Sequence, residues 1–166
     1  ASADTRGKCR SDQARFTSAH RVSEDMPELS GSDDQVSVFL KTAVEQLARG
    51  AVHAALTAAS EACHCAPDDP RAHYVYGQAW LAHNQPARAE QAFTAAIKLA
   101  PQFADAWINY GIARYRQGAI EDAKTAMRQV LLFAPDHAVA TSNLAAFMRD
   151  RRDLPTYTAT LPRPGL

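Results

Sequence analysis

Residues 104–137, ADAWINYGIARYRQGAIEDAKTAMRQVLLFAPDH, decide the fold, because residues 70–103 repeat their pattern of small, aromatic and apolar positions. The pair Tyr-Gly recurs at 76–77 and 110–111, and a proline recurs 34 residues apart at Pro67, Pro101 and Pro135. A constant period of this length is typical of proteins built from stacked copies of one small structural unit.

The turn residues divide each repeat into two helices. Gly50, Asn84 and Gly118 occupy one repeat position, and glycine and asparagine are the residues that tolerate a left-handed backbone at a helix end. The recurring prolines come shortly after the second helix of each pair and end it. The pattern predicts an all-α protein with helices over residues 33–49, 52–65, 70–83, 86–99, 104–117, 120–133 and 138–151.

The run Ala106-Trp107-Ile108-Asn109-Tyr110-Gly111 resembles the tetratricopeptide repeat closely, and the preceding repeat shows the same features at Tyr76, Gly77, Ala89 and Phe93. The resemblance implies a right-handed α-solenoid of helical hairpins, in which the first helices line a concave groove. About three hairpins and a C-terminal capping helix are expected, over residues 36–69, 70–103, 104–137 and 138–151. The pattern ends at Arg152 and Pro155, before a fourth hairpin can close.

The segments on either side of the repeats have a different composition. Residues 1–31 are rich in Ser, Asp and Arg and lack sustained helical periodicity, so we expect a flexible N-terminal arm. Residues 152–166 contain three prolines and are expected to form an extended C-terminal tail. The repeat domain itself is predicted to span residues 32–151.

Charge and composition limit the partners. The chain has 18 Lys and Arg against 18 Asp and Glu, a net charge of zero, which does not favour nucleic acid or an anionic membrane surface. No apolar run approaches the roughly 20 residues of a membrane span. We expect a soluble protein, in the cytoplasm rather than the periplasm, although a chain that begins at Ala1 leaves a removed leader open. The preference for Arg over Lys, with abundant Ala, is typical of bacteria with GC-rich genomes.

Cys63-His64-Cys65 is the most tempting group for metal or thiol chemistry. One period later, Cys63 aligns with Ile97 and Cys65 aligns with Leu99, so both thiols stand at apolar positions of the repeat. Free cysteine packs as a small hydrophobe, and no second ligand pair with zinc-site spacing follows. We interpret these cysteines as packing residues and expect no metal.

Known catalytic motifs are missing from the sequence. It has no glycine-rich phosphate loop, zinc-protease helix motif or serine nucleophile elbow. The repeat also accounts for nearly every apolar and small residue, which leaves little chain for a catalytic pocket. We therefore expect a protein that is not an enzyme and needs no cofactor.

The first helix of each predicted hairpin supplies the residues that packing does not use. By the resemblance, these side chains line the groove and bind a segment of a partner protein. The predicted groove residues are Lys41, Arg71, Tyr74, Gln78, Asp105, Ile108, Asn109, Ile112, Arg116 and Asn143, with Val44, Val75, Ser142 and Arg149 beside them.

Asn109 and Asn143 lie one period apart and are expected to project from successive first helices. Each carboxamide can donate one hydrogen bond to an extended peptide backbone and accept another, so the pair would form a short ladder. The alternative is that both are solvated polar residues on an exposed helix face.

Some tetratricopeptide domains hold the terminal carboxylate of a heat-shock protein with two lysines, an arginine and two asparagines. The family's first helix can be aligned with the helix near residue 36 or with the helix that begins at residue 70. In each alignment only one of the five positions matches well, so we do not expect binding of that chaperone tail. Basic residues such as Lys41, Arg71 and Arg116 mildly favour an acidic partner segment.

Three functions from different classes follow from these observations. The leading hypothesis is a noncatalytic adaptor that binds another protein or peptide segment in its groove. The alternative is a structural subunit or assembly factor, such as a chaperone, of a larger bacterial complex, with contacts through the outer surface, the arm or the tail. The third is a metal or thiol enzyme at Cys63 and Cys65.

Overall fold

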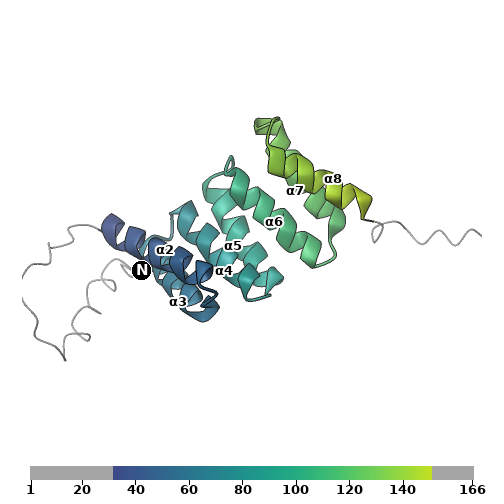
Figure 1. Cartoon of the computed structure of the whole chain (residues 1–166). Helices are drawn as coiled ribbons and strands as arrows, with labels where there is room; N and C mark the ends of the chain where they lie inside the picture. Colours follow the sequence, from purple (N-terminus) through teal and green to yellow (C-terminus); the bar gives the residue numbers. More distant parts are fainter. Residues whose placement is uncertain (1–31, 151–166) are drawn as a thin grey trace, which may run out of the picture.

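The computed structural model describes residues 32–150, which fold into seven α-helices with no strand (Figure 1). The predicted helix ends agree with the observed ones to within one or two residues, so the all-α prediction is confirmed. The predicted arm at residues 1–31 and tail at residues 152–166 lie outside the described residues. The helices are α2 (Ser32–Ala48), α3 (Val52–Cys65), α4 (Pro70–Ala82), α5 (Pro86–Leu99), α6 (Ala104–Arg116), α7 (Ile120–Phe133) and α8 (Ala138–Arg149).

The helices are arranged as three hairpins and one further helix. Helix α2 packs on α3, α4 on α5 and α6 on α7, and each second helix also packs on the first helix of the next pair, ending with α7 on α8 (Figure 1). Consecutive first helices touch as well, α2 with α4, α4 with α6 and α6 with α8, more extensively than the second helices touch one another. We call the surface formed by α2, α4, α6 and α8 the first-helix face.

The turn inside each hairpin depends on one residue with a left-handed backbone. The φ angles are 75° at Gly50, 58° at Asn84 and 84° at Gly118, as the shared repeat position predicts. Only glycine, and to a lesser degree asparagine, adopts this conformation at little cost. These residues therefore fix where the chain reverses direction between the paired helices.

A missing side chain allows the paired helices to approach closely. A methyl group placed on Gly77 of α4 would lie 2.5 Å from Cε1 of Phe93 on α5. Gly111 of α6 has the same role, since a methyl group there would lie 2.5 Å from Cε of Met127 on α7. Phe93 and Met127 are the largest fully buried side chains of α5 and α7, and the two glycines make room for them.

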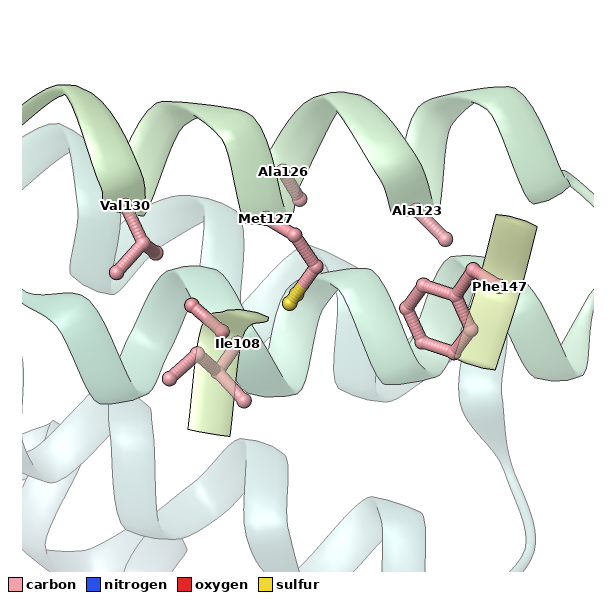
Figure 2. Close-up of a cluster of buried hydrophobic side chains, with 7 residues drawn as sticks. Ile108, Ala123, Ala126, Met127, Val130 and Phe147 are labelled. Carbon is pink, nitrogen blue, oxygen red and sulfur yellow. The ribbon is translucent and has the colours of Figure 1, made fainter. Parts of the chain in front are cut away.

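The best-developed part of the core lies between α6, α7 and α8 (Figure 2). Met127 and Val130 of α7 meet Ile108 of α6 there, and Phe147 of α8 closes the cluster. Full burial of side chains of this size contributes about 1.5–3 kcal/mol each. The same cluster therefore attaches the last helix to the third hairpin.

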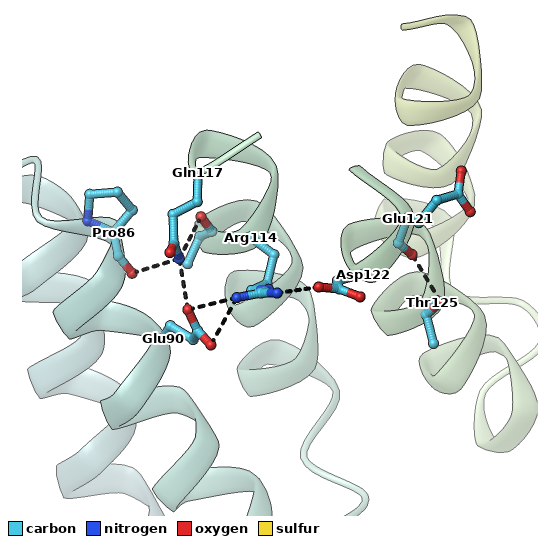
Figure 3. A network of polar contacts seen from close by, with 8 residues as sticks. Pro86, Glu90, Arg114, Gln117, Glu121, Asp122 and Thr125 are labelled. Carbon is cyan, nitrogen blue, oxygen red and sulfur yellow. Dashed lines mark hydrogen bonds and ion pairs between the residues drawn. The ribbon is translucent and has the colours of Figure 1, made fainter. Parts of the chain in front are cut away.

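An ionic network adds a polar link between α5, α6 and α7 (Figure 3). Arg114 donates at 3.1 Å to both carboxylate oxygens of Glu90 on α5, and its other terminal nitrogen pairs with Asp122 on α7. Gln117 donates to Glu90 at 2.8 Å. Arg114 stands one period after Trp80, so an ion pair here replaces the aromatic contact of the preceding hairpin.

Candidate functional site

The Tyr74 hydroxyl is the centre of a polar cluster on the first-helix face. Gln78, one turn further along α4, donates its amide to this oxygen at 2.9 Å. Asn109 on α6 donates to the same oxygen at 3.2 Å. The cluster thus joins two successive first helices through side chains that are 35 residues apart in the sequence.

The ring of Tyr74 packs against two phenylalanine rings. Its centroid lies 4.9 Å from that of Phe103 and 6.0 Å from that of Phe93. Burial, with a smaller contribution from the negative charge of Asp105, raises the pKa of Tyr74 above its usual value of 10.0. The hydroxyl therefore keeps its proton at physiological pH. Since a phenol oxygen has two acceptor positions and both are used by amides, its hydrogen is the group left for a ligand.

Asn109 is oriented by a second contact. Its amide nitrogen also donates to the backbone carbonyl of Asp105, one turn earlier on α6, at 2.9 Å. With the nitrogen held by two acceptors, the carboxamide oxygen of Asn109 is the free end of the group. No residue of the described part of the chain donates to that oxygen, nor to the side-chain oxygen of Gln78.

The cluster therefore offers one hydroxyl donor and two amide acceptors within a small area. An extended peptide presents alternating N–H and C=O groups along its length, which require donors and acceptors of this kind. The groups of the cluster, a protonated phenol and two carboxamides, are donors and acceptors of hydrogen bonds.

Three other predicted residues lie on the two helices that carry the cluster, α4 and α6. Arg116 is exposed on α6 and donates to the backbone carbonyl of Leu81 on α4 at 3.1 Å, so it belongs to the same face. Asp105 is exposed at the start of α6. Arg71 is exposed at the start of α4, where it forms a two-pronged ion pair with Asp69, with N···O distances of 3.1 Å and 2.8 Å.

The remaining predicted residues make no hydrogen bond to the Tyr74 cluster. Lys41 is exposed on α2. Ile112 is half-buried and packs against the core cluster of α6, α7 and α8. Asn143 is half-buried on α8, and its side chain makes no hydrogen bond within residues 32–150. The asparagine ladder stays a prediction, because Asn109 is engaged with Tyr74 and no contact joins it to Asn143.

Two residues assigned to the groove from the sequence lie in the core instead. Ile108 is 5% exposed and packs against Met127 and Val130, and Val75 is 6% exposed between α4 and the first hairpin. Ile108 lies in the cluster formed with α7 of its own hairpin and with α8, whereas Val75 lies against α2 and α3. Neither offers a surface to a ligand, so we leave both out of the site.

Sequence reasoning missed a second polar contact on this face. The hydroxyl of Tyr115 on α6 donates to the carboxylate of Asp150, directly after α8, and its ring stacks on Phe147 with centroids 4.6 Å apart. Tyr115 aligns with Leu81 one period earlier, a position that already faces α6.

Cys63 lies in an environment that suppresses thiol reactivity. Burial, and then the negative charge of Asp69, raise the pKa of Cys63 to about 11. Its Sγ lies 3.9 Å from Nδ1 of His73, whose Nε2 is 2.8 Å from the backbone carbonyl of Pro67. Because a carbonyl oxygen can only accept, Nε2 of His73 is the donor in that contact. Because its pKa is raised, the Cys63 thiol stays protonated at neutral pH and is a poor nucleophile.

Residues 32–150 contain no group of three or more His, Cys, Asp or Glu side chains arranged to hold a metal ion. Over the same range, none of the helices combines the length and apolar character that a membrane crossing requires.

The repeats of this chain match models of a known protein family. Two family models, both described as tetratricopeptide repeat, match residues 40–102 and residues 81–146. Together they cover residues 40–146, from the second half of α2 through most of α8. The chain belongs to the tetratricopeptide repeat family.

Among curated proteins, the chain is 31% identical over 104 residues to protein O-mannosyl-transferase TMTC1 of Mus musculus. The match covers 60% of this chain and 11% of that protein, so the chain spans about a ninth of the relative.

Solved structures with the same fold include two peptide complexes. The second tetratricopeptide domain of human RPAP3 with the HSP70 peptide SGPTIEEVD has a TM-score of 0.68 and 21% identity, covering 72% of this chain and 100% of that one. The Yersinia enterocolitica type III secretion chaperone SycD with a peptide of the translocator YopD has a TM-score of 0.65 and 15% identity, covering 74% and 97%. At these identities the likeness establishes the fold.

Proposed function

We propose that this protein is a noncatalytic interaction module that binds an extended segment of a partner protein across α4 and α6 on its first-helix face. The observation that carries the proposal is the Tyr74 cluster, in which the amides of Gln78 and Asn109 occupy the acceptor sites of one hydroxyl. This leaves a hydroxyl hydrogen and two amide oxygens for a ligand. The peptides bound by the RPAP3 domain and by SycD support the same use of the fold.

The hydrogen bonds of the Tyr74 cluster are expected to orient the ligand more than they increase its affinity. A hydrogen bond in water contributes about 0.5–1.5 kcal/mol net, so three such bonds hold the backbone in register without giving high affinity alone. Because the cluster is fixed by Phe93, Phe103 and Asp105 before a ligand arrives, little side-chain entropy is lost on binding. We expect a dissociation constant in the micromolar range, about −8 kcal/mol.

The test is selection of peptides from a random library on the purified protein, followed by titration of the selected peptides. We expect Tyr74→Phe combined with Asn109→Ala to weaken binding at least tenfold, because it removes the hydroxyl donor and one amide acceptor. The phenyl ring keeps its contacts with Phe93 and Phe103, so the melting temperature should change little.

The matched control is Arg128→Ala, at an exposed position of the second helix α7. It should leave the affinity unchanged. Peptides that bind the double variant as well as the original protein, or that lose affinity equally with Arg128→Ala, would show that the ligand does not use the Tyr74 cluster.

A further inference from the structure

Arg116, in the last turn of α6, has a guanidinium that is held in place but has no acidic partner. Its Nη1 donates to the backbone carbonyl of Leu81 on α4 at 3.1 Å, which fixes the group between the two helices that carry the Tyr74 cluster. Nε and Nη2 lie together on another edge of the planar group and remain for a ligand. No carboxylate within residues 32–150 forms an ion pair with Arg116.

Two other arginines of the chain show what such an edge binds. Nε and Nη2 of Arg71 hold the carboxylate of Asp69 in a two-pronged ion pair, with N···O distances of 3.1 Å and 2.8 Å. Arg114 likewise pairs with carboxylates on α5 and α7. A guanidinium edge matches the two oxygens of a carboxylate, so the open edge of Arg116 is suited to the same group.

The repeat itself does not require a cation at this position. The equivalent residues of α2 and α4 are Ala48 and Ala82, and both are exposed. A basic residue in the last turn of a helix interacts favourably with the helix dipole, but this effect needs neither the contact with Leu81 nor an open edge. Arg116 is therefore a feature of the surface formed by α4 and α6, and not of the repeat packing.

One extended segment can reach both Arg116 and the Tyr74 cluster. Leu81, which accepts from Arg116, lies seven residues after Tyr74 on α4, which is about 10 Å along the helix axis. An extended chain advances about 3.3 Å per residue, so about three residues cover this distance. A carboxylate at about this separation from the backbone contact therefore meets the Arg116 guanidinium.

The other end of α6 has the opposite charge. Asp105, in the first turn of α6, is exposed. Burial, and then the negative charge of Asp105, raise the pKa of Tyr74, so this charge lies near the hydroxyl. Arg71, at the equivalent position of α4, is already paired with Asp69. An acidic residue of a partner is therefore repelled at this end of α6 and attracted at the Arg116 end.

We propose that Arg116 binds an acidic side chain of the partner segment, about three or four residues from the residue that contacts the Tyr74 cluster and on the side away from Asp105. The assignment rests on the proposed function, because it concerns the same segment on the same two helices. The Leu81 carbonyl fixes the guanidinium before the segment arrives, so less side-chain entropy is lost than for a mobile surface arginine. Because the ligand is a side chain, a terminal carboxylate is not required.

The test is selection from a random dodecapeptide library, displayed at the N-terminus of a phage coat protein, on the full chain and on Arg116→Glu. Display of this kind leaves the peptides without a free carboxyl terminus. We expect the peptides selected on the original protein to share an acidic residue on one side of a common motif, and those selected on Arg116→Glu to lack it. The selected peptides are then titrated with their C-termini amidated.

Titrations with substituted protein and substituted peptide isolate the ion pair. Arg116→Glu should weaken binding at least about tenfold, and so should replacement of the peptide's acidic residue by the corresponding amide. In the Arg116→Glu protein the amide peptide should bind no more weakly than the acidic one, because the pair is already broken. Since the second substitution is made in the peptide, it tests the ion pair even if Arg116→Glu lowers stability.

Two further variants serve as controls. Arg116→Lys keeps the charge but lacks the planar fork, and should weaken binding about threefold. Arg128→Glu makes the same change of charge at an exposed position of α7 and should leave the affinity unchanged.

The outcomes separate this inference from the proposed function. Peptides that lose affinity with Tyr74→Phe and Asn109→Ala, but bind Arg116→Glu as well as the original protein, would overturn the role of Arg116 and leave the proposed function intact. An equal loss with Arg128→Glu would do the same. Peptides that are insensitive to Tyr74→Phe and Asn109→Ala, or a selection that yields no binding peptide, would overturn both.

Discussion

Substitution of Gly77 by alanine tests the packing of the hairpins most directly. The added methyl carbon would lie 2.5, 2.7 and 2.8 Å from three carbons of the Phe93 ring. Carbon atoms in contact prefer a separation of about 3.5–4.0 Å, so α4 and α5 must separate by roughly 1 Å or the ring must move. The ring is fully buried and packs beside Tyr74, which leaves it little room.

Two opposing effects set the size of the change. Overpacking of a filled core costs about 1–3 kcal/mol. Alanine inside a helix is more favourable than glycine by about 0.5–1 kcal/mol, which offsets part of that cost. We therefore expect Gly77→Ala to lower the free energy of unfolding by about 1–2 kcal/mol, measured by urea denaturation followed by far-ultraviolet circular dichroism.

Gly111→Ala is the matched control, one period later in the chain. Its methyl carbon would lie 2.5 Å from Cε of Met127, the end of a flexible side chain, and 3.2 Å and 3.3 Å from Cβ of Ala126 and the backbone oxygen of Ala123. Because methionine adapts to its surroundings more easily than a phenyl ring, this variant should lose less stability than Gly77→Ala. If Gly77→Ala is as stable as the original protein, or if Gly111→Ala is the more damaging of the two, the packing argument is refuted.

A double-mutant cycle locates the cause. Phe93→Leu shortens the side chain that faces Gly77, so Gly77→Ala should cost less in that background than in the original. The loss in the free energy of unfolding caused by Gly77→Ala should be smaller by at least about 0.5 kcal/mol in the Phe93→Leu background, a coupling energy typical of residues in direct contact. Coupling near zero would place the strain elsewhere.

Three further predictions concern the turn, a helix end and a buried thiol. Asn84→Gly should keep or raise the melting temperature and Asn84→Ala should lower stability by about 1 kcal/mol, because the φ angle of 58° is left-handed; equal melting curves would contradict this. Asp69 accepts from the backbone nitrogen of Arg71 at 2.8 Å at the start of α4, so Asp69→Ala should cost about 0.5–2 kcal/mol in urea denaturation at neutral pH. That difference should shrink as the pH falls below 3.8, since the Arg71 hydrogen bond lowers the pKa of Asp69 and its stabilising effect is lost on protonation. With Cys9 and Cys65 changed to serine, Cys63 should react with a thiol reagent far more slowly in the folded than in the unfolded protein, and equal rates would refute the burial argument. The free energy of unfolding should also fall between about pH 9 and pH 11, because in this range only the unfolded state has lost the thiol proton.

The sequence predicted the helices well because their limits are set locally. Gly50, Asn84 and Gly118 place the hairpin turns, and Pro67, Pro101 and Pro135 end the second helices. These preferences belong to single residues and their neighbours, so they can be recognised without knowledge of the rest of the fold. The 34-residue period then predicted which helices pair, because every hairpin repeats the same small and large positions.

The candidate site was predictable only in part. The repeat placed Tyr74, Gln78 and Asn109 on the first helices, and the structure joins them through hydrogen bonds. It also assigned Ile108 to the groove, although this residue is buried. The boundary between core and surface on a helix depends on the tilt of its neighbours, which a period does not encode.

The sequence by itself thus determined the class of fold, the pairing of helices and the left-handed turns, since each depends on local backbone preference and on the spacing of small and large residues. Only the tertiary structure decided that Asn109 is oriented by Tyr74, that burial keeps the Cys63 thiol protonated and that Ile108 lies in the core. These properties arise from distances between side chains on different helices, and those distances are fixed by how the hairpins stack.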